Sequence, residues 1–201
     1  MSDIGIASAL VALPVMGSVS AGAERDVALM ERIGAGDLDA FEQLYRLYHP
    51  RLTRFLLTLT HRPTIVDEVL NDTMMAIWEK PASFRGRSRL STWVLAIAYR
   101  KAMRALRRQD LPHESPANDE ATGEAADGPL TRAQVHRLLV EAMAQLSPDH
   151  RAVIDLTYFH ELGYRDIAEI MDCPVDTVKT RMFHARRHLK RLIAGTPADW
   201  L

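Results

Sequence analysis

The sequence contains a single cysteine, Cys173, so no disulfide can form within the chain, as expected of a protein that works in a reducing cytoplasm. It also lacks an apolar run of the roughly 18 residues that a membrane-spanning helix needs. Residues 4–19 are apolar, but Pro14 and Gly17 interrupt them and no basic residue precedes Arg25, which disfavours a secretory signal. We therefore expect residues 1–23 to form a disordered N-terminal extension.

The strict alternation of apolar and polar residues that marks a half-buried strand is also missing. So are a glycine-rich phosphate-binding loop, a carboxylate cluster for two metal ions, and a nucleophile beside a partnered base. His184 and His188 have the i, i+4 spacing of some zinc sites, but no Cys, Asp or Glu with ligand spacing accompanies them on their helix. An enzyme acting on nucleic acid is thus disfavoured, and no catalytic residue, cofactor or metal site is predicted.

What is present is a helical pattern, which predicts an all-α protein of two small domains. We place the first domain at residues 24–109 and the second, a helix-turn-helix domain, at residues 130–201. Residues 110–129 contain six acidic residues, three prolines and no basic residue, so we expect a flexible acidic linker there. In the first domain we expect helices over residues 24–33, from a cap at Asp37, from Pro63 to about Lys80, and from a cap at Ser91 to about Arg108. In the second domain we expect helices near residues 130–146, from a cap at Ser147, over 164–171 and over 176–193.

Positive charge is concentrated in two helical segments, although the net charge of the whole chain is only −1. Such local basic surfaces attract nucleic acid through phosphate neutralisation and counterion release. In the second domain the small Ala168, a break at residues 172–174 and a basic helix follow one another, as in a DNA-binding helix-turn-helix. A solvated amphipathic helix that closes a small bundle is the alternative. The side chains expected to meet bases and phosphates are Thr177, Lys179, Thr180, Arg181 and His184. Four further cations are expected to follow the DNA backbone, namely Arg186, Arg187, Lys190 and Arg191.

The helix expected from Pro63 has two unlike faces. One is apolar and includes Val66, Leu70 and Ile77. The opposite face suits a basic protein partner better than DNA, although an ordinary solvated face is the alternative. It carries Glu68, Asp72, Met75 and Glu79, with Asn71 and Trp78 to one side.

The last helix of the first domain places Trp93 among cations, opposite a core face that includes Leu95 and Tyr99. A tryptophan beside a row of cations can stack on bases while the cations hold phosphates, or it can pack under the preceding loop instead. That loop offers an aromatic ring and three guanidinium groups, which suits an unstacked base of single-stranded DNA. The residues concerned are Phe84, Arg85, Arg87 and Arg89 in the loop, and Ile97, Arg100, Lys101, Arg104 and Arg108 on the helix.

Two ordered sets of motifs resemble a known family. Asp67-Glu68-Val69-Leu70-Asn71-Asp72-Thr73, then Trp78, Ser91-Thr92-Trp93 and Ile97-Ala98, resemble region two of bacterial extracytoplasmic-function sigma factors. Leu146-Ser147-Pro148, Tyr164-Arg165-Asp166-Ile167-Ala168 and the run from Pro174 to Arg181, with Ala185-Arg186, resemble their region four. The resemblance covers residues 24–192, linker included.

The resemblance implies a dissociable promoter-specificity subunit of RNA polymerase, often held inactive by an anti-sigma factor. It implies that Glu68, Asn71, Asp72, Met75, Trp78 and Glu79 bind the clamp helices of the largest core subunit. It implies that Phe84, Arg85, Arg87, Arg89, Thr92, Trp93, Arg100, Lys101 and Arg104 bind and help melt the minus-ten element. It implies that Tyr164, Arg165, Thr177, Lys179, Thr180, Arg181, His184, Arg186 and Arg187 bind the minus-thirty-five element.

The chain departs from the family pattern at several of these positions. Asn71 stands where Gln is common, Arg100 where Asn is common, and Arg104 where Asp is common. Asp172 and Asp176 replace usual glycines, and Asp tolerates the left-handed turn conformation expected at position 172. The alternative function is that of a stand-alone helix-turn-helix regulator. That function does not explain the acidic face and the tryptophan-bearing face of the first domain.

Overall fold

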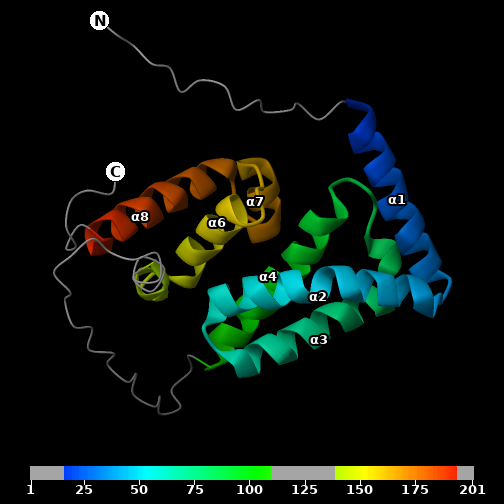
Figure 1. Cartoon of the computed structure of the whole chain (residues 1–201), viewed down its shortest axis with the longest axis horizontal. Helices are drawn as coiled ribbons and strands as arrows, with labels where there is room; N and C mark the ends of the chain where they lie inside the picture. The colour runs from blue at the N-terminus through cyan, green and yellow to red at the C-terminus, as the bar shows by residue number, and fades with distance from the viewer. Residues whose placement is uncertain (1–15, 110–138, 194–201) are drawn as a thin grey trace, which may run out of the picture.

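A computed structural model describes residues 16–109 and 139–193, and the described residues form helices without a strand (Figure 1). Residues 110–129, predicted to be the linker, and most of residues 1–23 lie outside this range. The helices are α1 (Met16–Gly34), α2 (Leu38–Thr60), α3 (Pro63–Glu79), the short 3-10 helix η1 (Pro81–Ser83), α4 (Leu90–Gln109), α6 (Pro148–Tyr158), α7 (Tyr164–Met171) and α8 (Val175–Ile193). Residues 139–144 are helical as well.

Local signals account for most of the helix ends. The Asp37 side chain accepts a hydrogen bond from the Ala40 backbone N–H at 3.0 Å, and that of Ser147 accepts one from the His150 backbone N–H at 3.4 Å. Both are the predicted N-caps of α2 and α6. Pro63 occupies the first turn of α3, where its missing N–H costs no helical hydrogen bond.

Two helix starts differ from the prediction. Helix α1 begins at Met16, inside the segment expected to be a disordered extension, because no proline between Met16 and Gly34 prevents the helix from extending toward the N-terminus. Helix α4 begins at Leu90, so Ser91 lies inside the helix and is not its cap. The Leu90 backbone N–H donates instead to the Asp26 carboxylate of α1, at 3.3 Å.

Helices α1 to α4 form the first half of the molecule. Helix α2 packs against α3 and α4, and α1 lies across α2 and η1. The predicted apolar faces of α3 and α4 are buried, and Leu44, Phe55 and Ile77 are among the fully buried side chains between the helices. This packing leaves the opposite faces of α3 and α4 at the surface.

Helices α6 to α8 form the second half, with α7 and α8 arranged as the predicted helix-turn-helix. Asp172 ends α7 in the left-handed conformation with a φ of 49°, and its backbone N–H donates to the Ala168 carbonyl. Val178, Met182 and Ala185, which share one face of α8, are buried. Its outer face is therefore presented to solvent.

The two halves are in direct contact. Helix α4 packs against α7, and α2 packs against α6, so that one continuous set of buried apolar side chains runs through both halves. Helix α8 packs on α6 and α7 and runs along the outer side of the second half (Figure 1). Helices α4 and α8, which carry the basic segments, thus belong to different halves that share one core.

Candidate nucleic-acid and polymerase interfaces

The outer face of α3 is exposed, as predicted. Asn71 and Glu79 are exposed, and Met75, a large apolar side chain, is 52% exposed. The carboxylate of Glu68 pairs with Arg108 at 2.9 Å, and that of Asp72 pairs with Lys101 at 3.5 Å. Part of the negative charge of this face is therefore matched by cations of α4.

Trp78 differs from the rest of the α3 face. It is half-buried, and its ring meets that of Phe41 on α2 edge-on, with the ring centroids 5.1 Å apart. The indole therefore supports α3 from beside the exposed face, which leaves only part of its surface for a partner.

The loop before α4 joins an aromatic pair to a set of guanidinium groups. The rings of Phe84 and Trp93 lie 5.4 Å apart and both side chains are half-buried, so Trp93 packs under the preceding loop, which the sequence left open as the alternative. Gly86 has a φ of 65°, which turns the loop sharply. Arg85, Arg87 and Arg89 are exposed around this turn.

The predicted DNA-facing residues of α4 do not all reach the surface. Arg100 and Arg104 are exposed, and Lys101 is half-buried in its pair with Asp72. Thr92 is fully buried, and its hydroxyl has no hydrogen-bond partner among the described residues. Thr92 is therefore not accessible to DNA in this arrangement, because it lies two turns before the buried Tyr99 on the inner side of α4.

The outer face of α8 carries most of the predicted residues. Lys179, Thr180 and His184 are exposed on its first turns. The Thr180 hydroxyl donates to the Asp176 carbonyl at 2.9 Å, and the Lys179 ammonium pairs with the Asp176 carboxylate at 2.9 Å. The other predicted residues near this face are Arg165, Arg186 and Arg187, which are exposed, and Tyr164 and Thr177, which are half-buried.

Phe183 was missed by the sequence analysis. Its phenyl ring is 62% exposed on α8, three residues after Thr180 and four after Lys179. This spacing is the signal that would have found it, because residues three and four apart share a helix face. An exposed aromatic ring among cations adds an apolar contact to the surface, of the kind that can meet a thymine methyl group.

Arg181 does not lie on this outer face. Its guanidinium pairs with the Asp149 carboxylate of α6 at 2.6 Å, and Nη1 lies 3.6 Å from Cys173 Sγ. Its side chain is 25% exposed. In this arrangement position 181 borders the buried stripe of α8, and the Arg181 charge joins α8 to α6. The contact of Arg181 with bases stays a prediction.

Asp149 also connects the two halves of the molecule. Its carboxylate accepts a hydrogen bond from the Tyr99 hydroxyl of α4 at 2.6 Å. Burial, together with this bond and the nearby negative charge, raises the pKa of Tyr99 above its ordinary value. Tyr99, Asp149 and Arg181 thus form a chain of polar contacts from α4 through α6 to α8.

Comparison with known proteins identifies the family. The Sigma-70 region 2 model matches residues 44–111, and the Sigma-70 region 4 model matches residues 136–189. The ECF RNA polymerase sigma-E factor of Haemophilus influenzae is 31% identical over 183 residues, which cover 84% of this chain and 95% of that protein. This chain belongs to the ECF RNA polymerase sigma factors.

Further relatives agree with this assignment. The sigma factor YlaC of Bacillus subtilis is 31% identical over 159 residues, which cover 76% of this chain and 91% of that protein. The solved structure of the sigma factor RpoE with the anti-sigma factor NepR from Bartonella quintana is 27% identical, with a TM-score of 0.59 over 78% of this chain and 98% of that chain. The structure of CnrH with the cytosolic domain of CnrY, at 22% identity and a TM-score of 0.60, covers 86% of this chain and 99% of that chain and shares the fold.

As an ECF sigma factor, the protein directs RNA polymerase to promoters. The match to region 2 accounts for the first half, which a stand-alone helix-turn-helix regulator would leave unexplained. The family regulates transcription and is not a family of catalysts. In the described part of the sigma factor no helix is long and apolar enough to cross a membrane, and no three His, Cys, Asp or Glu side chains gather as a metal site would need.

Proposed function

We propose that this sigma factor assigns its acidic helix to core RNA polymerase and its basic helices to promoter DNA. The observation that carries the proposal is the separation of charge between exposed faces. Helix α3 contains no basic residue, whereas α8 contains two lysines and four arginines. Faces of opposite sign would steer the chain to a basic patch on the enzyme at one end and to phosphates at the other.

On the α3 face, Met75 is the apolar centre of the polymerase contact. Its exposed side chain lies between Asn71 and Glu79, one turn to either side. A partly desolvated apolar centre with a polar rim is the usual composition of a protein interface. Glu68 and Asp72 belong to the rim, where their pairs with α4 hold the carboxylates in position.

The loop and α4 bind the minus-ten element in this proposal. Phe84 and Trp93 form an aromatic platform, and the guanidinium groups around it would hold the phosphates of an opened strand. The arginines concerned are Arg85, Arg87, Arg89, Arg100 and Arg104, all of them exposed.

The first turns of α8 bind the minus-thirty-five element. Lys179, Thr180, Phe183 and His184 share its outer face and would enter the major groove, while Arg165 and Arg187 contact the backbone. The protein carries out no chemistry of its own and works in the cytoplasm beside the polymerase. Because the RpoE structure from Bartonella quintana contains an anti-sigma factor, we also propose that a separate inhibitor covers these surfaces.

Run-off transcription with sigma-free core enzyme on genomic fragments tests the proposal. Addition of the protein is expected to yield transcripts from defined start points. Trp93→Ala is expected to reduce permanganate reactivity of the melted region more than closed-complex formation, since the platform acts on opened bases. Arg46→Gln, which removes one exposed charge on α2, is the control for a surface substitution away from the platform. Failure of the wild-type protein to direct any defined start would contradict the proposal.

A further inference from the structure

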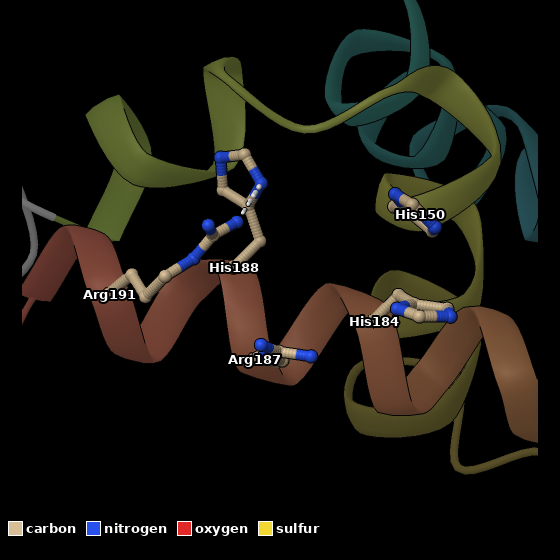
Figure 2. A pocket seen from close by; sticks show the side chains of 5 residues that line it. All are labelled: His150, His184, Arg187, His188 and Arg191. Atoms are coloured by element: carbon tan, nitrogen blue, oxygen red, sulfur yellow. Dashed lines mark hydrogen bonds between the residues drawn. The ribbon is translucent and has the colours of Figure 1, made fainter.

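A basic hollow lies between α6 and α8, beside the helix face assigned to DNA. It has a volume of about 360 Å³ and is lined by His150, His184, Arg187, His188 and Arg191 (Figure 2). All five side chains carry a positive charge or acquire one on protonation, and among the described residues no acidic side chain lines the hollow. This composition is unlike that of a zinc site, because guanidinium groups repel a cation.

The side chains converge from two helices. His150 lies in the first turn of α6, and its ring centroid is 6.5 Å from that of His184 on α8. His184, His188 and Arg191 are spaced i, i+4 and i+7, so they follow one stripe of α8. The Arg191 guanidinium lies 3.5 Å from Nδ1 of His188, as the dashed line in Figure 2 shows.

The charge around the hollow is not balanced from within the described residues. Burial lowers the pKa of His150, and the positive groups His184, Arg181 and His188 lower it further. Asp149 opposes this effect, but its carboxylate is already bonded to Arg181 and Tyr99. An anion in the hollow would relieve the repulsion and favour the protonated histidines.

We propose that this hollow binds a phosphate group, with arginine donors holding the oxygens and the histidines binding more strongly once protonated. A guanidinium fork matches two phosphate oxygens, and a protonated imidazole adds a charge-assisted hydrogen bond. The source favoured by position is a backbone phosphate of the promoter, because the stripe continues the α8 face that carries Thr180 and Phe183. This source rests on the proposed function, whereas the same chemistry would also accept a free polyphosphate.

The first arm of the test uses holoenzyme, assembled from core enzyme and the full chain, and a promoter duplex. Replacement of His188 and Arg191 by Gln is expected to weaken binding about tenfold and to lower the salt slope by about one unit for each cation removed. Wild-type binding is expected to strengthen from pH 7.5 to pH 6, because a bound phosphate favours the protonated form of the histidines, and the double variant, which lacks His188, is expected to lose part of this gain. Arg46→Gln, on α2, is the matched charge control.

The second arm titrates the free chain with inorganic pyrophosphate and follows the imidazole resonances of the three histidines. If the hollow binds phosphate, the imidazole resonances of the wild-type protein shift to saturation as pyrophosphate is added, and those of the double variant do not. Circular dichroism is expected to show that the double variant keeps the helicity of the wild-type protein. Loss of pyrophosphate binding without loss of promoter affinity would identify a free ligand as the source. If the double variant matches the wild-type protein in both arms, the proposal is overturned. A wild-type holoenzyme that binds no promoter would count against the proposed function alone, because the pyrophosphate arm needs no polymerase.

Discussion

At the scale of single residues, two neighbouring cations of α8 have different tasks. Lys179 is exposed and lies next to Thr180 on the outer face, whereas the Arg181 guanidinium is joined to Asp149 and lies beside Cys173. The helix-turn-helix pattern and the family resemblance placed both on the DNA side. The distinction requires the position of α6, which no pattern within α8 reveals.

Arg181→Gln is expected to lower the free energy of unfolding by about 1–3 kcal/mol, because it leaves the Asp149 carboxylate without its charged partner. Lys179→Gln is expected to leave stability within about 0.5 kcal/mol and to weaken binding to the minus-thirty-five element. Urea unfolding and promoter binding by the holoenzyme measure the two effects. An Arg181 variant of unchanged stability with relaxed base preference would restore the sequence-based assignment.

At the scale of elements, helix types and most helix ends could be predicted because they depend on neighbouring residues. Asp37, Ser147 and Pro63 act within three residues of the ends they define. The start of α4 could not be predicted in the same way, because the residue that caps it, Asp26, precedes it by 64 positions. The burial of Thr92 likewise depends on how α4 is packed and not on the local pattern.

A substitution in the turn between α7 and α8 is expected to stabilise the protein. Asp172 holds a φ of 49°, a region that favours glycine. Asp172→Gly is expected to raise the free energy of unfolding by about 0.5–1 kcal/mol, because relief of the strain exceeds the added entropy of the unfolded chain. Thermal unfolding measures the gain, and equal promoter affinity is the control. A loss of stability would mean that the Asp172 side chain holds the turn.

At the scale of the whole molecule, the direct contact between the two halves was not predicted from the sequence. The pattern predicted two domains on a tether, and the linker itself lies outside the described residues. Tyr99 was predicted on the core face of its helix, but periodicity does not say which other helix covers that face. The structure shows that α4 and α7 cover each other.

The hydrogen bond from Tyr99 to Asp149 tests whether this contact couples the halves. Tyr99→Phe keeps the ring and removes the donor, so the free energy of unfolding is expected to fall by about 1 kcal/mol. Amide hydrogen exchange is expected to quicken in α4 and in α6 together. Tyr158→Phe changes an exposed tyrosine of α6 and is the control. Faster exchange confined to α4 would mean that the bond does not link the halves.

The central claim, that α3 serves the enzyme and α8 serves the template, is tested most directly by the affinity for core RNA polymerase. Fluorescence anisotropy of labelled protein compares Met75→Ala with Lys179→Gln. Met75→Ala is expected to weaken core binding about tenfold, as for a side chain at an interface centre, and Lys179→Gln is expected to leave core binding unchanged. Equal loss in the two variants, or no loss with Met75→Ala, would contradict the division of tasks.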